Sequence, residues 1–290
     1  MTNDRLGIAL MVLTMLVFSL QDGVSRHLAG EYNVLMIVMI RYWFFAAFVL
    51  TIASRKAGGL RAAAATSQPG LQITRALLLA AEICVGVWGF VLLGLVEAHA
   101  VFAACPLIIA ALSGPVLGER VGWRRWIAIG VGFIGILVVL QPGRGVFSPV
   151  ALVPMAMALM FALYSLLTRY AARRDSSATS FFWTGTVGAV AMTAVGLSFW
   201  EPMVLADWGW MAVLCGLSSL GHYLLIRVYE LTEASVVQPF AYLQLVFASI
   251  VGVTVFGEVL ETHVVIGAII VMAAGLFTLW RTRAVEAAKG

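Results

Sequence analysis

The chain has 290 residues, of which 62% are hydrophobic and 11% are charged, and its mean hydropathy is +1.01. A soluble domain of this size needs a more highly charged surface, so the composition excludes that class and favours an integral membrane protein. The formal net charge of +4 does not indicate nucleic-acid binding, because the basic residues lie in short connections between apolar runs instead of forming one patch.

Apolar runs follow one another along the whole chain and predict ten membrane-spanning helices. In chain order, the predicted spans are Leu6–Gln21, Val34–Ala53, Ile73–Leu95, Ala98–Leu117, Trp126–Leu140, Pro149–Tyr170, Ala178–Phe199, Trp208–Val228, Ala234–Phe256 and His263–Trp280. The longest connection, from Ser54 to Gln72, is rich in alanine and glycine and is expected to be a flexible connector. No soluble domain is expected between the spans.

The 18 Lys and Arg residues are divided unequally between the two sides of the predicted bundle. Connections on the side of the N-terminus hold all but three of them, since Arg26 and Arg144 lie on the other side and Arg41 lies within a span. In membrane proteins the cytoplasmic connections carry the excess of positive charge. Both termini are therefore predicted to be cytoplasmic.

A stretch that begins at Glu97 and ends at Glu119 has a diverged copy at residues 233–258. Each copy opens with Glu-Ala, carries a proline in an apolar run and closes on Gly-Glu. The copies predict two halves of five spans each, and an odd number of spans makes the second half enter the membrane in the opposite sense. Glu119 and Glu258 are then expected to face opposite sides of the membrane, as caps and gate contacts at the ends of two proline-bearing helices.

The predicted fold is an all-α integral membrane protein whose ten transmembrane helices form two inverted five-helix repeats around a central cavity. Residues 1–141 are predicted to form the first repeat, residues 149–282 the second, and residues 283–290 a cytoplasmic tail. Inverted repeats are typical of secondary transporters, whose substrate site lies between the halves near the membrane midplane.

Two ionisable residues, Arg41 and Glu82, lie inside predicted spans. An ionised group in the membrane is costly unless it is paired or hydrated, so the first expectation is a salt bridge between these two side chains. The functional alternative is that Arg41 binds a substrate carboxylate or that Glu82 carries a proton.

The ninth span carries a polar stripe made of Gln238, Tyr242 and Ser249, which recur at helical spacing on one face. Pro239 frees a backbone carbonyl one turn earlier and is expected to kink the helix, as Pro106 is in the fourth span. The stripe is expected to line the cavity, and the alternative is a face that packs against another helix.

His222 lies in the middle of the eighth span. The first expectation is a histidine that is simply hydrogen-bonded within the bundle, and the functional alternative is that it titrates near physiological pH and couples transport to protons. Among the aromatic residues inside spans, Trp88, Tyr164 and Trp183 are expected to line an adaptable apolar cavity, with packing as the alternative.

Asp22 and His99 lie near the ends of predicted spans. Polar side chains at span ends reach the membrane interface, so both are expected to be interfacial residues. A role for Asp22 in proton transfer is the second interpretation.

The sequence contains no HExxH, CxxC or nucleophile-elbow motif. The GxGxxG pattern from Gly130 to Gly135 lies within an apolar span and indicates helix packing, not a dinucleotide-binding loop. We therefore expect no catalytic residues, no metal, no cofactor and no enzymatic activity. The expected partners are the lipid bilayer and a small-molecule substrate, without nucleic acid, and the protein is expected to function as a monomer.

The order of these features resembles the drug/metabolite transporter superfamily with its tandem EamA-type domains. The resemblance rests on the two five-helix halves, the prolines of the fourth and ninth spans, and the Gly118-Glu119 and Gly257-Glu258 pairs at their ends. Arg41, in MIRYWFF, also lies where that family often has an arginine. The first span departs from the family, because Ser-Leu-Gln-Asp-Gly at residues 19–23 replaces the commoner Trp-Gly-small pattern.

Within this superfamily, the pattern looks most like the bacterial exporters of amino acids, including aromatic ones. The resemblance implies a secondary transporter of the bacterial inner membrane that moves amino acids, including aromatic and neutral ones, by alternating access, in the direction of export. A carrier for another metabolite or drug-like compound of the same superfamily is the alternative. A channel and an intramembrane enzyme are more distant alternatives.

Overall fold

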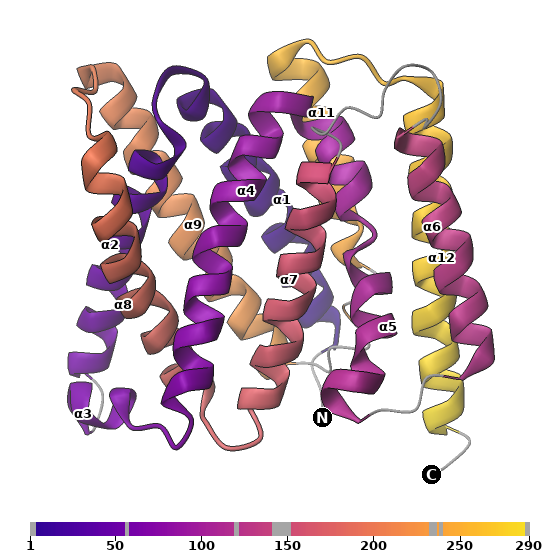
Figure 1. Cartoon of the computed structure of the whole chain (residues 1–290), viewed down its shortest axis with the longest axis horizontal. Helices are drawn as coiled ribbons and strands as arrows, with labels where there is room; N and C mark the ends of the chain where they lie inside the picture. Colours follow the sequence, from indigo (N-terminus) through magenta and orange to yellow (C-terminus); the bar gives the residue numbers. More distant parts are fainter. Residues whose placement is uncertain are drawn as a thin grey trace.

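The computed structural model describes residues 4–55, 58–118, 122–140, 152–231, 237 and 240–287. Over these residues the regular secondary structure is entirely helical, which confirms the all-α prediction. The long helices run roughly parallel or antiparallel to one another in a single bundle (Figure 1). Both chain termini lie at the same end of this bundle, which we call the terminal end, and the opposite end is the distal end (Figure 1).

The helices in chain order are α1 (Asp4–Glu31), α2 (Val34–Arg55), α3 (Gly59–Ala64), α4 (Pro69–Phe102), α5 (Cys105–Leu117), α6 (Trp123–Leu140), α7 (Leu152–Ala171), α8 (Ser177–Gly196), the 3₁₀ turn η2 (Leu197–Phe199), α9 (Leu205–Leu231), α11 (Leu243–Phe256) and α12 (Thr262–Ala287). In the described chain, five helices are long and apolar enough to cross a membrane, namely α1, α2, α4, α7 and α8 with η2. The total of ten membrane crossings stays a prediction from the sequence.

The surface of the bundle is apolar and its interior holds polar groups. Large apolar side chains such as Val190, Ile250 and Leu77 are exposed, whereas Arg75 and Glu82 are buried. In water this arrangement would be unfavourable, but in lipid the exposed apolar groups meet hydrocarbon, and polar groups are tolerated only inside the protein. The distribution therefore agrees with a membrane protein.

The two halves of the chain run in opposite directions through the bundle. In Figure 1, α1 leads from the terminal end to the distal end, whereas α7, its counterpart in the predicted repeat, leads from the distal end to the terminal end. Among the described helices, α1 packs against α9 and α4 packs against α7, which are equivalent pairs under that repeat. The pairs α2–α8 and α6–α12 form the two flanks (Figure 1).

The α6–α12 contact depends on small residues. A Cβ atom at Gly135 would lie 2.9 Å from the carbonyl oxygen of Gly267, and one at Gly267 would lie 2.6 Å from that of Gly135. Any side chain at either position would push the helices apart, because both obstacles are backbone atoms. The interpretation of the Gly130–Gly135 pattern as helix packing is thus confirmed at Gly135.

The boundary predicted between the third and fourth spans, at residues 95–98, falls inside α4, which has a break at Gly94 and does not end there. Gly94 has φ 83° and ψ 172°, a conformation that L-residues rarely adopt, and the helix then resumes and continues to Phe102. A turn follows, and Pro106 lies in the first turn of α5, where its missing N–H costs no hydrogen bond. Pro106 therefore helps to begin a helix, and its predicted role as a kink within one is wrong.

Both repeated Gly-Glu pairs mark a helix end. Gly118 ends α5 with φ 75°, and Gly257 ends α11 with φ 67°. A left-handed glycine at this position lets the chain leave the helix without a steric cost. Glu119, which follows the first of them, lies outside the described residues.

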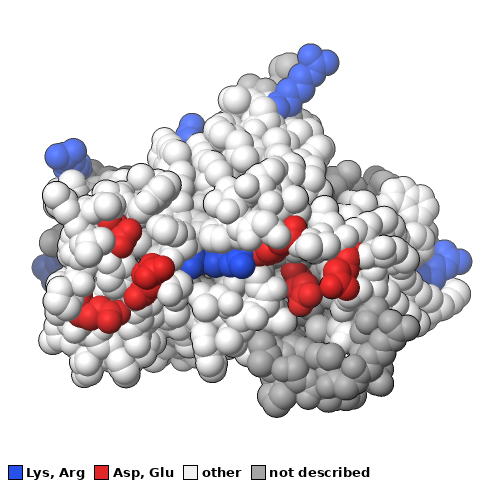
Figure 2. Space-filling view, turned by 90° about the horizontal axis from the view of Figure 1, so that it is seen from above, with Lys and Arg blue, Asp and Glu red and all other residues white. Residues whose placement is uncertain are grey.

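The two ends of the bundle differ in charge. Figure 2 views the distal end and shows acidic side chains gathered around one basic side chain, while other basic side chains project at the margins. The acidic residues of the distal connections are Glu31, Glu201, Asp207, Glu258 and Glu261. The basic residues of the terminal connections include Arg55, Arg61, Arg124, Arg173 and Arg174.

Candidate functional site

Arg41 lies in the middle of α2 and is 7% exposed. Its Nε donates a hydrogen bond of 2.8 Å to the Ser218 hydroxyl of α9. The side chain borders a narrow cavity of about 10 Å³, room for about one water molecule. The lining residues are Arg41, Tyr42, Phe45, Leu79, Ile83, Ser218 and His222. We call this space the central cavity.

Glu82 lies on α4 and is 4% exposed. No ion pair joins it to Arg41, although the structure describes both side chains, so the expected salt bridge is not formed in this conformation. The reason is that Arg41 is directed to α9 and hydrogen-bonds to Ser218 instead. Glu82 nevertheless lies within coulombic range of both Arg41 and Asp22. Two buried ionisable groups, one basic and one acidic, thus lie near one small cavity without a direct ion pair.

His222 borders the central cavity from α9, as the sequence prediction allowed. Its ring stacks on Phe45 with centroids 5.7 Å apart and meets the edge of Phe18 at 5.5 Å. Ser218 lies one helical turn before it on the same face. The cavity wall therefore combines a cation, two hydrogen-bonding groups and aromatic rings.

Three residues that were predicted to line the cavity lie elsewhere. Trp88 is 54% exposed on the outer face of α4. The Nε1 of Trp183 donates to the carbonyl of Ala64 near the terminal end. Tyr164 lies on α7 with its ring 5.2 Å from the Arg75 guanidinium. None of the three borders the central cavity, because each belongs to a helix face that is turned toward lipid or toward another contact.

The predicted polar stripe of the ninth span is only partly described. Tyr242 is buried against α12, where a Cβ atom at Gly275 would lie 1.6 Å from its hydroxyl oxygen. Ser249 is half-buried in α11. Gln238 and Pro239 lie outside the described residues. For Tyr242 the structure thus favours the packing alternative over cavity lining.

Glu258 joins three helices at the distal end. Its carboxylate accepts hydrogen bonds of 2.8 Å from the backbone amides of Leu95 and Val96, and it forms an ion pair with Arg26. The break at Gly94 leaves these amides without helical partners, and the positive end of a helix favours a carboxylate. We call the contact of Glu258 with Arg26 and the two amides the distal latch.

Two further features belong to the distal latch. A Cβ atom at Gly94 would lie 2.6 Å from one carboxylate oxygen of Glu258, so only glycine leaves space there. The Arg26 guanidinium lies 4.1 Å above the Phe256 ring, which adds a cation–π contact to the ion pair. The latch therefore depends on a glycine and a backbone break in α4 and on the Phe256 ring of α11, besides its charged groups.

Asp22 and His99 form a buried pair that the sequence prediction missed. His99 is 2% and Asp22 8% exposed, so neither is the interfacial residue that was expected. His99 Nε2 lies 3.1 Å from Asp22 Oδ2, and His99 Nδ1 lies 2.9 Å from the carbonyl of Leu95. One signal was available, since Ser19, Asp22 and Arg26 recur at helical spacing and form a polar stripe on α1.

Amide side chains complete the surroundings of Asp22. Gln244 of α11 donates to Oδ2 over 3.1 Å, and Gln21 donates to Oδ1 over 3.2 Å. The His99 ring also stacks on Phe90, with centroids 5.0 Å apart and planes nearly parallel. Asp22 is thus held by groups from α1, α4 and α11, the same elements that carry the distal latch.

A second polar network lies at the terminal end. Arg75 of α4 is 1% exposed, its Nε donates to Thr168 over 2.8 Å, and its Nη1 donates to Gln72 over 2.7 Å. Gln72 in turn donates to Asp175 over 2.7 Å. Partial burial opposes ionisation of Asp175, but hydrogen bonds from Thr66 and Gln72 outweigh it and hold the pKa of the carboxyl below its usual value. This network ties α4 to α7 and to the connection before α8.

Helix packing is unequal at the two ends. At the distal end α4 packs against α1 and against α11. The equivalent contacts under the predicted repeat would join α9 to α7 and to α5, and within the described residues α9 makes no comparable packing with either helix. Within the described residues, the packing of α4 at the distal end thus has no counterpart at the terminal end.

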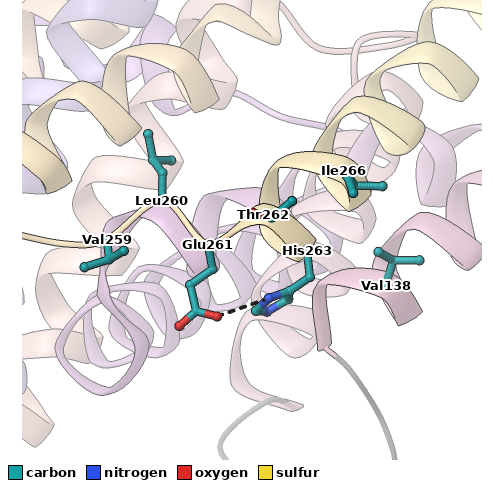
Figure 3. Close-up of a pocket in the computed structure, with 7 residues that line it drawn as sticks. All are labelled: Val138, Val259, Leu260, Glu261, Thr262, His263 and Ile266. Atoms are coloured by element: carbon teal, nitrogen blue, oxygen red, sulfur yellow. Dashed lines mark ion pairs between the residues drawn. The ribbon is translucent and has the colours of Figure 1, made fainter.

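A shallow hollow of about 590 Å³ at the distal end is a weaker candidate (Figure 3). It is open to the surface and lies between the end of α6 and the start of α12. His263 Nδ1 lies 3.2 Å from a Glu261 oxygen at its rim. Neither Arg41 nor Glu82 lines the hollow, so we assign the functional site to the central cavity.

Comparisons with known proteins agree with this architecture. Two stretches, residues 5–141 and 148–280, match the model of the EamA-like transporter family. A solved crystal structure with 16% sequence identity superposes with a TM-score of 0.66 over 97% of this chain and 99% of that chain, which shows the likeness of fold.

Two curated relatives span nearly the whole chain. The S-adenosylmethionine uptake transporter of Rickettsia prowazekii (strain Madrid E) is 27% identical over 283 residues, which are 96% of this chain and 95% of the relative. The riboflavin transporter of Rhizobium johnstonii (strain DSM 114642 / LMG 32736 / 3841) is 29% identical over 279 residues, 94% of this chain and 90% of the relative. These names do not support the expected restriction to amino-acid exporters. The chain belongs to the EamA-like transporter family and is a membrane transporter with tandem EamA domains.

Proposed function

We propose that the protein is a secondary carrier for S-adenosylmethionine or a closely similar metabolite, and that it works by alternating access. The observation that carries this proposal is the presence of Arg41 and Glu82, a basic and an acidic side chain that are both buried, near one cavity without an ion pair between them. Buried charges are costly, so they are expected to meet complementary charges of a ligand. The names of the relatives supply the candidate substrate.

The chemistry of S-adenosylmethionine fits these groups. Its carboxylate would accept hydrogen bonds from Arg41, and its ammonium and sulfonium groups would lie near Glu82. Its adenine ring would stack against aromatic side chains of the cavity wall, to which Phe45 and His222 belong. The cavity of about 10 Å³ is far too small for this ligand, so we assign the present conformation to a state in which the site is collapsed.

The distal latch would serve as one of two gates. The two five-helix halves, residues 1–141 and 149–282 with a tail at 283–290, are proposed to exchange conformations during the cycle. The sequence repeat matches Ser25-Arg26 with Thr168-Arg169 and Gly257-Glu258 with Gly118-Glu119. In the alternate state, the latch would open and Glu119 would help to close the terminal end.

We assign the protein to the bacterial inner membrane with both termini in the cytoplasm, because the excess of basic residues lies at the terminal end. The collapsed central cavity would then reopen toward the cytoplasm, since among the described helices α9 lacks at the terminal end the contacts that α4 makes at the distal end. Uptake is the proposed direction, in line with the uptake transporters among the relatives, and it replaces the export expected from the sequence. The carrier is proposed to act as a monomer.

Riboflavin is the second candidate substrate, and the aromatic wall of the cavity favours it together with the name of one relative. Riboflavin carries no charged group that would neutralise Arg41 or Glu82. A site for it would leave the buried guanidinium of Arg41 without a counter-charge. For this reason S-adenosylmethionine is the first ligand to test.

The test is counterflow with purified protein in proteoliposomes that are loaded with unlabelled S-adenosylmethionine. We expect saturable entry of labelled S-adenosylmethionine, competition by excess unlabelled compound, and no competition by phenylalanine. Arg41→Gln should raise the half-saturating concentration roughly 10- to 100-fold, because a charge-assisted hydrogen bond contributes about 1.5–3 kcal/mol. Arg124→Gln, a change at an exposed arginine of α6, is the matched control and should transport normally.

Other outcomes would point to other functions. Counterflow with riboflavin alone would select the second candidate, and counterflow with amino acids alone would restore the expectation from the sequence. Entry that does not saturate would indicate a channel, and conversion of the substrate would indicate an enzyme. Absence of counterflow with every compound of the panel would reject the proposal.

A further inference from the structure

The contacts of the buried Asp22–His99 pair can accommodate an extra proton. A carbonyl oxygen can only accept a hydrogen bond, so the contact between His99 Nδ1 and the Leu95 carbonyl places a hydrogen on Nδ1. The contact between His99 Nε2 and Asp22 Oδ2 then needs a second hydrogen, either on the ring or on the carboxyl group. In both cases the pair carries one proton more than a neutral imidazole and a carboxylate.

The surrounding groups place this proton on the histidine. Gln244 donates to Oδ2 of Asp22 and Gln21 donates to Oδ1, so both carboxyl oxygens already act as acceptors. An ionised Asp22 satisfies these donors and also accepts from the Nε2–H of an imidazolium. The result is a buried pair with no net charge.

We propose that the Asp22–His99 pair is the binding site for a coupling proton and that release of this proton opens the distal latch. The proposal rests on the proposed carrier function, and it adds the ion that would drive transport. While Nδ1 keeps its hydrogen bond to the Leu95 carbonyl, release of the proton leaves a buried carboxylate whose contact with the Nε2 lone pair is repulsive. A buried uncompensated charge is strongly unfavourable, so the helices that hold it must separate or admit water.

The proton site and the distal latch are joined through the same helices. On α1, Asp22 of the pair lies one turn before Arg26 of the latch. On α4, the carbonyl of Leu95 binds His99 while its amide binds Glu258. A shift of either helix that breaks the pair must therefore also move a partner of Glu258.

The charged and titratable groups around the pair come from each helix that packs against it. Arg26 on α1 is already paired with Glu258, and Glu82 on α4 lies within coulombic range of Asp22. From α11, the group that reaches Asp22 is the uncharged Gln244. Glu82 is thus a second acidic side chain in the neighbourhood of Asp22. Among the described residues, the buried Ser25 of α1 has no hydrogen-bond partner.

The first test measures opening of the distal end as a function of pH without any substrate. Ser25→Cys, a small change at a buried position next to the latch, serves as the reporter in a background that lacks Cys84, Cys105 and Cys215. Its rate of labelling by a membrane-impermeant thiol reagent is divided by that of an exposed distal reporter, Val204→Cys, to remove the intrinsic pH dependence of thiols. The normalised rate should be low at acidic pH and should rise as the pH increases.

Variants of the pair identify the titrating group. Asp22→Asn combined with His99→Gln replaces the pair by neutral amides that can still hydrogen-bond to each other, and it should make labelling independent of pH. A pH-independent rate in the unmodified pair would overturn the proposal. A pH-dependent rise that persists in the double variant would also overturn it, because another group would then be responsible.

The second test separates this inference from the choice of substrate. In proteoliposomes, Asp22→Asn should retain counterflow of S-adenosylmethionine and lose its accumulation driven by an imposed proton gradient. Accumulation that is unchanged in the variant would show that the pair is only structural and would contradict the proposal. Failure of counterflow in the unmodified protein would reject the proposed substrate. The labelling experiment uses no substrate, so it would still test the proton site independently.

Discussion

The distal and terminal ends of the bundle are built from repeated sequence, yet different contacts hold them. At the distal end, Glu258 joins α1 to two backbone amides of α4, and α4 packs on both α1 and α11. At the terminal end, a network around Arg75 joins α4 to α7, while the described part of α9 stays apart from α5 and α7. The difference teaches that related halves need not adopt the same conformation. It also shows that a single carboxylate, bound at the break of another helix, can distinguish one end of the bundle from the other.

The largest effect is expected from Gly94→Ala, a substitution that changes contacts of the distal end alone. The new methyl group would meet Glu258, and the residue would keep a positive φ, so strain and loss of the latch should together destabilise the closed state by about 3 kcal/mol. Distal thiol labelling should accelerate, and the melting temperature in detergent should fall. Gly70→Ala is the matched control, because a Cβ atom there meets nothing within 4 Å. Unchanged labelling in Gly94→Ala would show that the latch does not hold the distal end closed.

Glu258→Gln should have a smaller effect, about 1–2 kcal/mol, since an amide oxygen can still accept one hydrogen bond but loses the charge that pairs with Arg26. Distal labelling should increase and terminal labelling should decrease. The repeat-equivalent change, Glu119→Gln, should shift the two rates in the opposite directions. Equal effects of the two substitutions on both ends would contradict the assignment of one gate to each end.

Thr168→Val tests whether the terminal network is independent of the distal gate. Removal of the hydroxyl that accepts from Arg75 Nε should cost about 1 kcal/mol of stability. Distal labelling should not change, because this network does not contact α1 or α11. Thr186→Val, which removes a hydroxyl bonded only to a carbonyl of its own helix, is the control. A change in distal labelling would reveal coupling between the ends through α4.

The smallest effect is expected from Asp175→Asn, and it should depend on pH. The pKa of Asp175 is lowered in the folded protein, so its ionised form contributes stability above the pKa of the unfolded chain, about 3.9. That contribution is lost as the pH falls through the folded pKa. The melting temperatures of the unmodified protein and the variant should differ near neutral pH and converge in acid. A difference that is constant with pH would exclude ionisation of Asp175 as its cause.

Several elements of the fold follow from local sequence. Long apolar runs predict helices wherever the chain must satisfy its backbone in lipid, and the repeated Gly-Glu pairs predict the helix ends at Gly118 and Gly257. The break at Gly94 does not follow in this way. A glycine in an apolar run is compatible with a straight helix, and the break depends on Glu258, which lies far away in the chain.

The site was harder to predict than the helices. In a membrane, apolar side chains are stable both in the interior of the bundle and on its lipid-facing surface. Hydropathy therefore does not predict that Trp88 faces outward and that Phe45 faces the cavity. Asp22 and His99 meet only when α1 packs on α4, and their positions near span ends suggested the interface instead. Substrate identity is a further step that the fold does not determine.

The glycine contact between α6 and α12 has a mechanical consequence. Under the proposed repeat these helices are each other's counterparts, as are α2 and α8 on the other flank, so an exchange of conformation between the halves maps each flank onto itself. The close approach at Gly135 and Gly267 can therefore stay intact throughout the cycle and act as a pivot. A pair of spin labels across α6 and α12 should keep a constant distance with and without substrate, and so provide the fixed reference against which movement of α4 and α9 is measured.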